Sequence, residues 1–198
     1  MNLIFDLGGV VVRWEPEAII ASVFQNQEVR SKIREGVFGH PDWIELDRGT
    51  LPREDAIVRA AKRTGIPEAE VKRVLLAVPP SLVPIPETVD LLYQLKARGH
   101  PLYCLSNMHV ASIEHLEREQ RFFEVFSGKV ISCRLNLCKP EAAIYEHALR
   151  TYKLKAEDTV FIDDVDVNVA AAAKLGIRTI QFRSAAQCER ELRALGVR

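Results

Sequence analysis

The segment Asn2-Leu3-Ile4-Phe5-Asp6-Leu7-Gly8-Gly9, residues 2–9, decides how the chain folds. Its bulky apolar residues end at a single carboxylate, Asp6, and a glycine pair follows almost at once. A short apolar run before two glycines is typical of a buried strand that ends in a tight turn. We therefore expect an N-terminal strand with Asp6 at its carboxyl end.

Patterns of strand and helix alternate from about residue 86 onward. Apolar runs predict strands at 101–105, 129–131, 159–162 and 178–182. Helical patterns lie at 88–98, 110–119, 139–152 and 168–175, and Pro140 stands at the favoured first position of the third helix. This alternation implies an α/β fold, a Rossmann-like parallel sheet covered by helices on both faces.

Residues 14–85 follow a different pattern, which lacks the alternation of strands. Their apolar residues recur at helical spacing, and one helix is expected at about 68–77. Prolines at 79, 80, 84 and 86 predict a stiff linker after that helix. We expect two domains, a core of 1–13 and 86–198 and an inserted all-helical cap domain of 14–85.

The composition limits the partners that the chain can have. Of its 198 residues 47% are apolar, and 27 basic residues balance 27 acidic ones, so the net charge is zero. Nucleic acid and anionic membranes attract a basic excess, so neither is expected as a partner. No apolar run approaches the roughly 18–20 residues that span a bilayer. The N-terminal strand leaves no room for a signal peptide, and the four cysteines form no CxxC pair, so we expect reduced thiols in a cytoplasmic protein. The oligomeric state stays open.

Four polar clusters carry the candidate chemistry: Asp6, Ser106-Asn107, Lys139-Pro140 and Asp163-Asp164. In an open parallel sheet the functional crevice lies outside the carboxyl ends of the strands, where three of these clusters fall. Each has an ordinary alternative, because Asp6 could cap a turn, Ser106 could cap a helix and Lys139 could be a surface charge. The pair Asp163-Asp164 could be a solvated turn. Adjacent carboxylates repel each other unless a cation or solvent compensates them, and Mg²⁺ prefers such oxygens.

Taken together, the four clusters predict a phosphoryl-transfer site. A carboxylate nucleophile attacks phosphorus, and a divalent ion neutralises the repulsion between two anionic groups. The hydroxyl of Ser106 and the ammonium of Lys139 would hold the equatorial oxygens as charge spreads over them in the transition state.

The same segments resemble the haloacid dehalogenase-like superfamily of hydrolases. Ile4 to Val10 is similar to its first motif, Leu105-Ser106-Asn107 to the second, Lys139-Pro140 to the third, and Phe161 to Asp164 with Asn168 to the fourth. The helical stretch between the first two motifs matches the family's helical cap. The resemblance implies a magnesium-dependent phosphatase that acts on a small-molecule phosphate ester. It further implies catalytic roles for Asp6, Ser106 and Lys139, substrate binding by Ser106, Asn107 and Lys139, and metal binding by Asp6, Gly8, Asp163 and Asp164.

One position departs from the family's pattern. Phosphatases of the family usually carry a second aspartate two residues after the nucleophile, which serves as general acid and base, and here that position is Gly8. Glycine keeps the backbone carbonyl that binds the metal but loses the proton donor. The chain resembles more closely a subgroup with FDLGG or FDLGN openings, which includes bacterial alpha-D-glucose-1-phosphate phosphatases, so we expect a substrate similar to a sugar phosphate. General acid–base help is worth about 10²–10⁴-fold, and we expect a slow enzyme unless another group substitutes.

Candidates for that group and for substrate contacts are less well defined. His109 is a candidate acid, with a solvent-exposed loop histidine as the alternative. Trp43, Asp47 and Arg48 could face substrate, although Trp43 is also expected to pack among the cap helices, and Arg13-Trp14 could gate the site.

Two other functions compete with the phosphatase. Loss of the acid at Gly8 favours a catalytically weak or inactive binding or regulatory protein. A 2-haloacid dehalogenase would use the same aspartate on carbon without a metal, but such enzymes lack the paired aspartates seen at 163 and 164.

Overall fold

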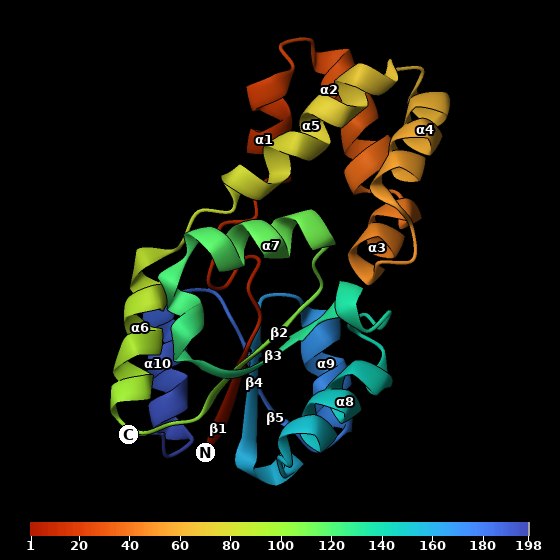
Figure 1. Ribbon diagram of the computed structural model, residues 1–198. Helices are drawn as coiled ribbons and strands as arrows, with labels where there is room; N and C mark the ends of the chain where they lie inside the picture. The colour runs from red at the N-terminus through yellow and green to blue at the C-terminus, as the bar shows by residue number, and fades with distance from the viewer. Residues whose placement is uncertain (198) are drawn as a thin grey trace.

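The computed structural model describes residues 1–197 and contains a parallel five-stranded sheet, which lies below the group of helices α1 to α5 in Figure 1. The strands are β1 (Asn2–Phe5), β2 (Leu102–Ser106), β3 (Phe126–Ile131), β4 (Thr159–Asp163) and β5 (Arg178–Gln181), in the order β3-β2-β1-β4-β5. Every neighbouring pair is parallel. The α/β, Rossmann-like fold expected from the alternating patterns is therefore confirmed.

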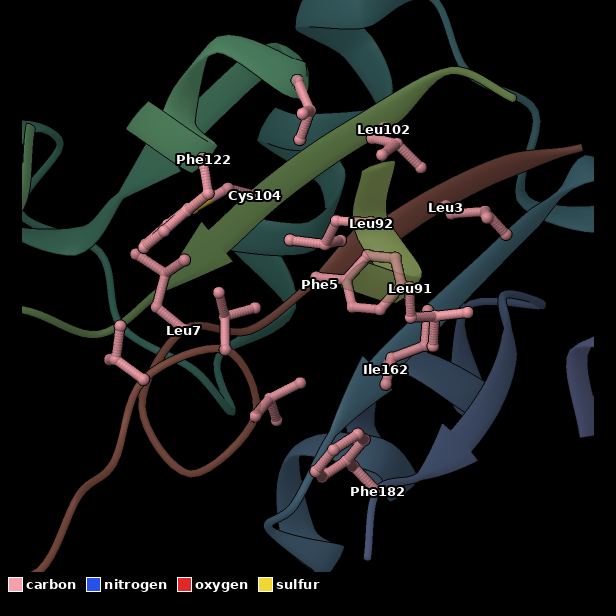
Figure 2. Packing of buried hydrophobic residues seen from close by; sticks show 14 of the residues in the cluster. Leu3, Phe5, Leu7, Leu91, Leu92, Leu102, Cys104, Phe122, Ile162 and Phe182 are labelled. Atoms are coloured by element: carbon pink, nitrogen blue, oxygen red, sulfur yellow. The ribbon is translucent and has the colours of Figure 1, made fainter. Parts of the chain in front are cut away.

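Helices cover both faces of this sheet. The helices α6 (Pro86–Ala97), α7 (Val110–Glu119) and α10 (Ala185–Ala194) pack on one face, and α8 (Ala142–Tyr152) and α9 (Asp166–Lys174) pack on the other. The strand β1 shows why both faces need cover, because it has apolar side chains on each. Side chains alternate across a strand, so Leu3 and Phe5 join the cluster under α6 and α10 while Ile4 joins the cluster under α8 and α9. Figure 2 shows Leu3 and Phe5 packed against Leu91 and Leu92 of α6.

All regular secondary-structure elements between β1 and α6 are helices. These are α1 (Pro16–Val23), α2 (Gln27–Ile33), a π-helical turn at Arg34–Phe38, α3 (Pro41–Arg48), α4 (Arg53–Thr64) and α5 (Glu68–Ser81). Their buried faces form a hydrophobic cluster of their own, from Ile19 to Val78. The two connections to the sheet lie side by side, because the N–H of Arg13 donates to the Val83 carbonyl (2.9 Å) and the N–H of Ile85 to the Val11 carbonyl (2.8 Å). These observations support our proposal of a core (1–13 and 86–198) and a cap (14–85).

Two local expectations were wrong. The helix expected at 68–77 continues through Pro79 and Pro80 to Ser81, so the linker is confined to residues 82–85. Pro79 and Pro80 lie in the last turn of this helix and have no N–H to donate to the carbonyls of the preceding turn, so they weaken the helix there and it ends at Ser81. Pro140 does not begin α8 either, since the helix starts at Ala142 and the cis Lys139–Pro140 bond lies in the turn before it. Among the helices of residues 1–197, none combines the length and apolar composition that crossing a bilayer requires.

Candidate active site

The topology brings the first and fourth motifs together. From β1 the chain continues to β2 on one side, whereas β4, which lies on the other side of β1, is followed by β5. Ligands of open α/β sheets bind where the strand order reverses in this way, outside the carboxyl ends. Asp6 directly follows β1, Asp163 is the last residue of β4, and Asp164 is the next residue. The acidic residues thus flank the reversal point.

A buried lysine joins these acidic residues. The Nζ atom of Lys139 lies 2.8 Å from Asp6 Oδ1 and 2.7 Å from Asp163 Oδ2. The Lys139 side chain is 1% exposed, so the alternative of a surface charge is wrong. An ammonium between two buried carboxylates forms charge-assisted hydrogen bonds and fixes their orientation.

Lys139 is held in place by Asn107, which follows β2. The amide Nδ2 of Asn107 donates to the Lys139 carbonyl (2.9 Å), and the N–H of Lys139 donates to Asn107 Oδ1 (2.8 Å). This two-way bridge ties the second motif to the third across 32 positions of the chain. Ser106 is buried at the end of β2 rather than capping a helix, since His109 occupies the N-cap of α7.

Asp163 is fixed by further donors. Its Oδ1 accepts hydrogen bonds from the N–H of Val165 (2.8 Å) and from Asn168 Nδ2 (3.1 Å), and the same amide reaches Oδ2 at 3.2 Å. Asn168 therefore orients this carboxylate, which explains its place in the fourth motif. With both oxygens so engaged, Asp163 is held rigidly toward Lys139.

The three carboxylates form a group that fits a divalent cation. One oxygen from each of Asp6, Asp163 and Asp164 lies within 4.8 Å of the other two. Lys139 contributes one positive charge against three negative ones, so the group keeps an excess of negative charge. Burial, opposed by Lys139 and reinforced by Asp163 and Asp164, raises the pKa of Asp6 to about 7. Burial and Asp163 also raise the pKa of Asp164. Hard oxygen donors with uncompensated charge are what Mg²⁺ prefers.

The glycine loop after β1 closes around this group. Gly9 adopts φ +74°, and a Cβ atom there would lie 2.3 Å from Asp164 Oδ2. The close approach and the left-handed backbone both require glycine at this position. Gly8 is less constrained, since the nearest atom to a Cβ there would be Trp14 Cβ at 3.7 Å.

A cavity of about 190 Å³ opens above these residues between the core and the cap. Its polar wall comes mainly from the core and holds Asp6, Asn107, His109, Ser112, Lys139, Asp164 and Asn168, together with Asp47 of the cap. Its apolar wall holds Trp14, Trp43, Val78, Leu82, Met108 and Val165. Ser112 and Val78 were missed because a helical pattern does not tell which residues face a cavity, and Met108 because it lies in the loop between β2 and α7.

Of the cap residues proposed from the sequence to face substrate, Trp43 and Asp47 line the cavity and Arg48 does not. Trp43 packs in the cap and lines the cavity as well, with its ring stacked on Trp14 (centroids 5.6 Å apart) and close to Phe38 (4.7 Å). Asp47 also lines the cavity. Arg48 turns away from it and pairs with Glu141 of the core, with Nη1 3.0 Å from Oε2.

His109 is not an exposed loop residue. It is 7% exposed, and its Nε2 lies 2.9 Å from Ser112 Oγ. Burial, with a smaller contribution from Arg53, lowers its pKa to about 4. The imidazole is therefore neutral near pH 7 and poorly suited to be the missing acid.

The chain belongs to the haloacid dehalogenase-like hydrolases, whose family model matches residues 2–176. The membership agrees with the parallel sheet, with the strand-end positions of the first, second and fourth motifs, and with the contact of Lys139 to Asp6 and Asp163.

The curated proteins that this chain resembles include one that is named as a phosphatase. It is 26% identical to the sesquiterpene phosphatase astK of Aspergillus oryzae over 192 residues, 97% of this chain and 94% of the relative. It is 27% identical to the drimenol cyclase drtB of Aspergillus calidoustus, but spans only 35% of that protein.

Solved structures share the fold. A HAD family enzyme of Bacteroides thetaiotaomicron, in complex with magnesium and inorganic phosphate, superposes with a TM-score of 0.71 over 92% of this chain and 93% of its own at 22% identity. The closeness to glucose-1-phosphate phosphatases expected from the FDLGG opening stays a prediction.

Proposed function

We propose that this hydrolase is a magnesium-dependent phosphatase that cleaves a small phosphomonoester through an aspartyl-phosphate intermediate on Asp6. The observation that carries the proposal is the convergence of Asp6, Asp163 and Asp164 within 4.8 Å, beside the buried ammonium of Lys139, on a cavity large enough for a small ligand. The magnesium and phosphate bound by the Bacteroides enzyme agree with this chemistry.

Each residue of the site has a role in the proposed reaction. An Asp6 carboxylate oxygen forms a bond to phosphorus while the bond from phosphorus to the ester oxygen breaks. Lys139 orients Asp6 and offers positive charge to the phosphoryl oxygens, and Ser106 and Asn107 are proposed to hold the phosphoryl group from the end of β2. Water then cleaves the acyl phosphate and releases inorganic phosphate, which regenerates the Asp6 carboxylate.

The proposed metal site uses the same residues. Asp6, Asp163, Asp164 and the carbonyl of Gly8 would hold Mg²⁺. The ion supplies positive charge that offsets the repulsion between Asp6 and an anionic substrate. Lys139 lowers the pKa of Asp6 against the effect of burial and orients this carboxyl through the 2.8 Å contact.

The leaving group is bounded by the apolar wall. The motif resemblance leads us to propose a sugar phosphate-like substrate. The rings of Trp14 and Trp43 and the aliphatic side chains of Val78 and Leu82 favour an alternative, the phosphate of an apolar alcohol. The name of the Aspergillus relative, a sesquiterpene phosphatase, supports including such esters among the candidates.

A phosphate-release screen tests the proposal. The chain is assayed with and without Mg²⁺ against glucose phosphates, nucleotides and farnesyl monophosphate, with Asp6→Asn as the negative control and Lys129→Met, a surface substitution, as the positive control. We expect Mg²⁺-dependent release that Asp6→Asn abolishes. No release from any ester would favour the inactive binding protein that Gly8 suggests, and chloride release from a 2-haloacid would identify a dehalogenase.

The partner and compartment are also proposals. A zero net charge supports a small-molecule partner rather than nucleic acid or a membrane surface. All four cysteines are free thiols, which supports a reducing, cytoplasmic environment.

A further inference from the structure

Gly8 leaves the proposed reaction without a proton donor on the nucleophile loop. An alkyl ester oxygen that leaves as an alkoxide needs a proton in the transition state, and a positioned acid is worth about 10²–10⁴-fold. A group that takes over this role must line the same cavity as Asp6 and must carry a transferable proton. It must also be held in place by the fold.

Asp47 of the cap meets the first condition. It is the next-to-last residue of α3 and lines the cavity together with Asp6 and Lys139. Within residues 1–197 the other carboxylates on the cavity wall, Asp6 and Asp164, belong to the acidic group on the core side. Asp47 thus lies on the cap side of the cavity, and in-line attack by Asp6 from the core side would direct the leaving group away from the core.

The fold positions Asp47 through its main-chain neighbours. Ser132 Oγ donates a hydrogen bond to the Asp47 carbonyl, and Asn136 Nδ2 donates to the Arg48 carbonyl (3.1 Å). The guanidinium of Arg48 binds both oxygens of Glu141. Gly49, at φ +81°, packs so closely on Cys133 that a Cβ atom would lie 2.6 Å from its carbonyl oxygen. The end of α3 is thus docked on the core segment 132–141, which includes Lys139.

The side chain of Asp47 is held as well. The backbone N–H of His109 and the side chain of Trp43 are close enough to its carboxyl to lower the pKa against the effect of burial. Trp43 and His109 line the same cavity as Asp47. The carboxyl is therefore enclosed by groups of both the cap and the core.

We propose that Asp47 is the general acid and base of the reaction, supplied by the cap in place of the side chain that Gly8 lacks. This role rests on the proposed phosphatase function. In the first step Asp47 gives its proton to the ester oxygen as the bond from phosphorus breaks, and the alcohol leaves. In the second step the Asp47 carboxylate takes a proton from the water that attacks phosphorus, so the proton balance is restored at each turnover.

The charges around Asp47 are consistent with a carboxyl that keeps its proton near neutral pH. Burial raises its pKa to about 7, the backbone N–H of His109 and the side chain of Trp43 oppose this, Asp6 raises it further and Lys139 lowers it. The other titratable groups that face it are the thiols of Cys133 and Cys138, and burial raises the pKa of both. The neutral imidazole of His109 contributes no charge.

The test compares leaving groups. Phosphate release by wild type and Asp47→Asn is measured with an alkyl phosphate, whose alkoxide needs a proton, and with nitrophenyl phosphate, whose phenolate leaves without one. The control is Asp42→Asn on the same helix, because Asp42 faces Arg63 of α4 (3.1 Å) and lies away from the active-site cavity. We expect Asp47→Asn to lower kcat/KM for the alkyl ester by about 10²–10⁴-fold, with a much smaller loss for the nitrophenyl ester. The comparison uses kcat/KM because this parameter reports the step in which the leaving group departs, whereas hydrolysis of the aspartyl phosphate is common to both esters.

Two further readouts separate an acid from a merely structural residue. The kcat/KM of wild type for the alkyl ester falls as pH rises above about 7, and this limb disappears in Asp47→Asn. A Cβ atom at Gly8 would be in ordinary contact distance of its neighbours, so an aspartate can be introduced there. We expect Gly8→Asp to restore the alkyl ester activity of Asp47→Asn and to add little activity to wild type.

Each alternative result has a distinct meaning. Equal losses of kcat/KM with both esters, or no loss with either, would overturn the role of Asp47 as the acid and leave the phosphatase standing. Activity that survives in Asp6→Asn, or a wild type inactive on every ester, would overturn the proposed function, and the role of Asp47 with it.

Discussion

Replacing Lys139 with methionine tests the charge balance of the site through stability. The substitution keeps an unbranched chain of similar length and removes the ammonium that lies 2.8 Å from Asp6 and 2.7 Å from Asp163. The side chains of all three residues are at most 10% exposed, so water does little to replace the lost partner. Removing one partner of a buried ion pair costs about 3–5 kcal/mol because the other charge is left uncompensated.

The matched control is Lys129→Met. Lys129 makes a contact of the same length to Glu117, 2.7 Å, but its side chain is 35% exposed. Exposed pairs of this kind are worth about 0–1 kcal/mol. Equilibrium urea unfolding followed by far-ultraviolet circular dichroism, with the metal chelated, measures both losses. In a chain of this size 1 kcal/mol shifts the Tm by about 2–4 °C, so melting curves give an independent reading.

Adding Mg²⁺ then reports on the acidic group itself. A cation bound among Asp6, Asp163 and Asp164 compensates the charges that Lys139→Met exposes, so saturating Mg²⁺ restores a larger share of stability in this variant than in wild type. A loss of Lys139→Met no greater than that of Lys129→Met, with no response to Mg²⁺, would refute the buried charge network.

Three more predictions follow from the geometry. Calorimetry of Mg²⁺ binding should show at least a 10-fold weaker affinity in Asp164→Ala, and equal affinities would remove this carboxylate from the site. Gly9→Ala should cost about 1–2 kcal/mol for its left-handed backbone and further weaken Mg²⁺ binding by displacing Asp164, whereas Gly65→Ala, at φ +72° with nothing within 4 Å, should pay the backbone cost alone. Asp47→Asn should stabilise the protein above pH 7. A carboxyl whose folded pKa is raised from 3.8 to about 7 makes the native state progressively less stable as pH rises through that window. The gain, at most about 4 kcal/mol, should therefore shrink toward pH 4 in melting curves, and a gain independent of pH would contradict the raised pKa.

The amino-acid sequence was sufficient for the sheet and for the residues at its edge. Apolar runs such as Leu3 to Phe5 and Val160 to Ile162 define buried strands, and the polar residues that follow them have to meet because parallel strands present their carboxyl ends at one edge. Asp6, Asp163 and Asp164 could therefore be placed together before any coordinates. The helices between β1 and α6 were expected from the helical spacing of apolar residues, and their assignment to a separate cap domain stays a proposal.

Only the tertiary structure decided how the cap meets the core. Arg48 and Glu141 are 93 positions apart, and no local pattern predicts that their pairing turns Arg48 away from the cavity while Asp47 faces it. Burial, which depends on every element packed around a side chain, likewise made Lys139 an interior cation and His109 a neutral imidazole. Sequence determines local conformation through short-range sterics and periodicity, whereas the pKa values and orientation of these side chains depend on long-range packing.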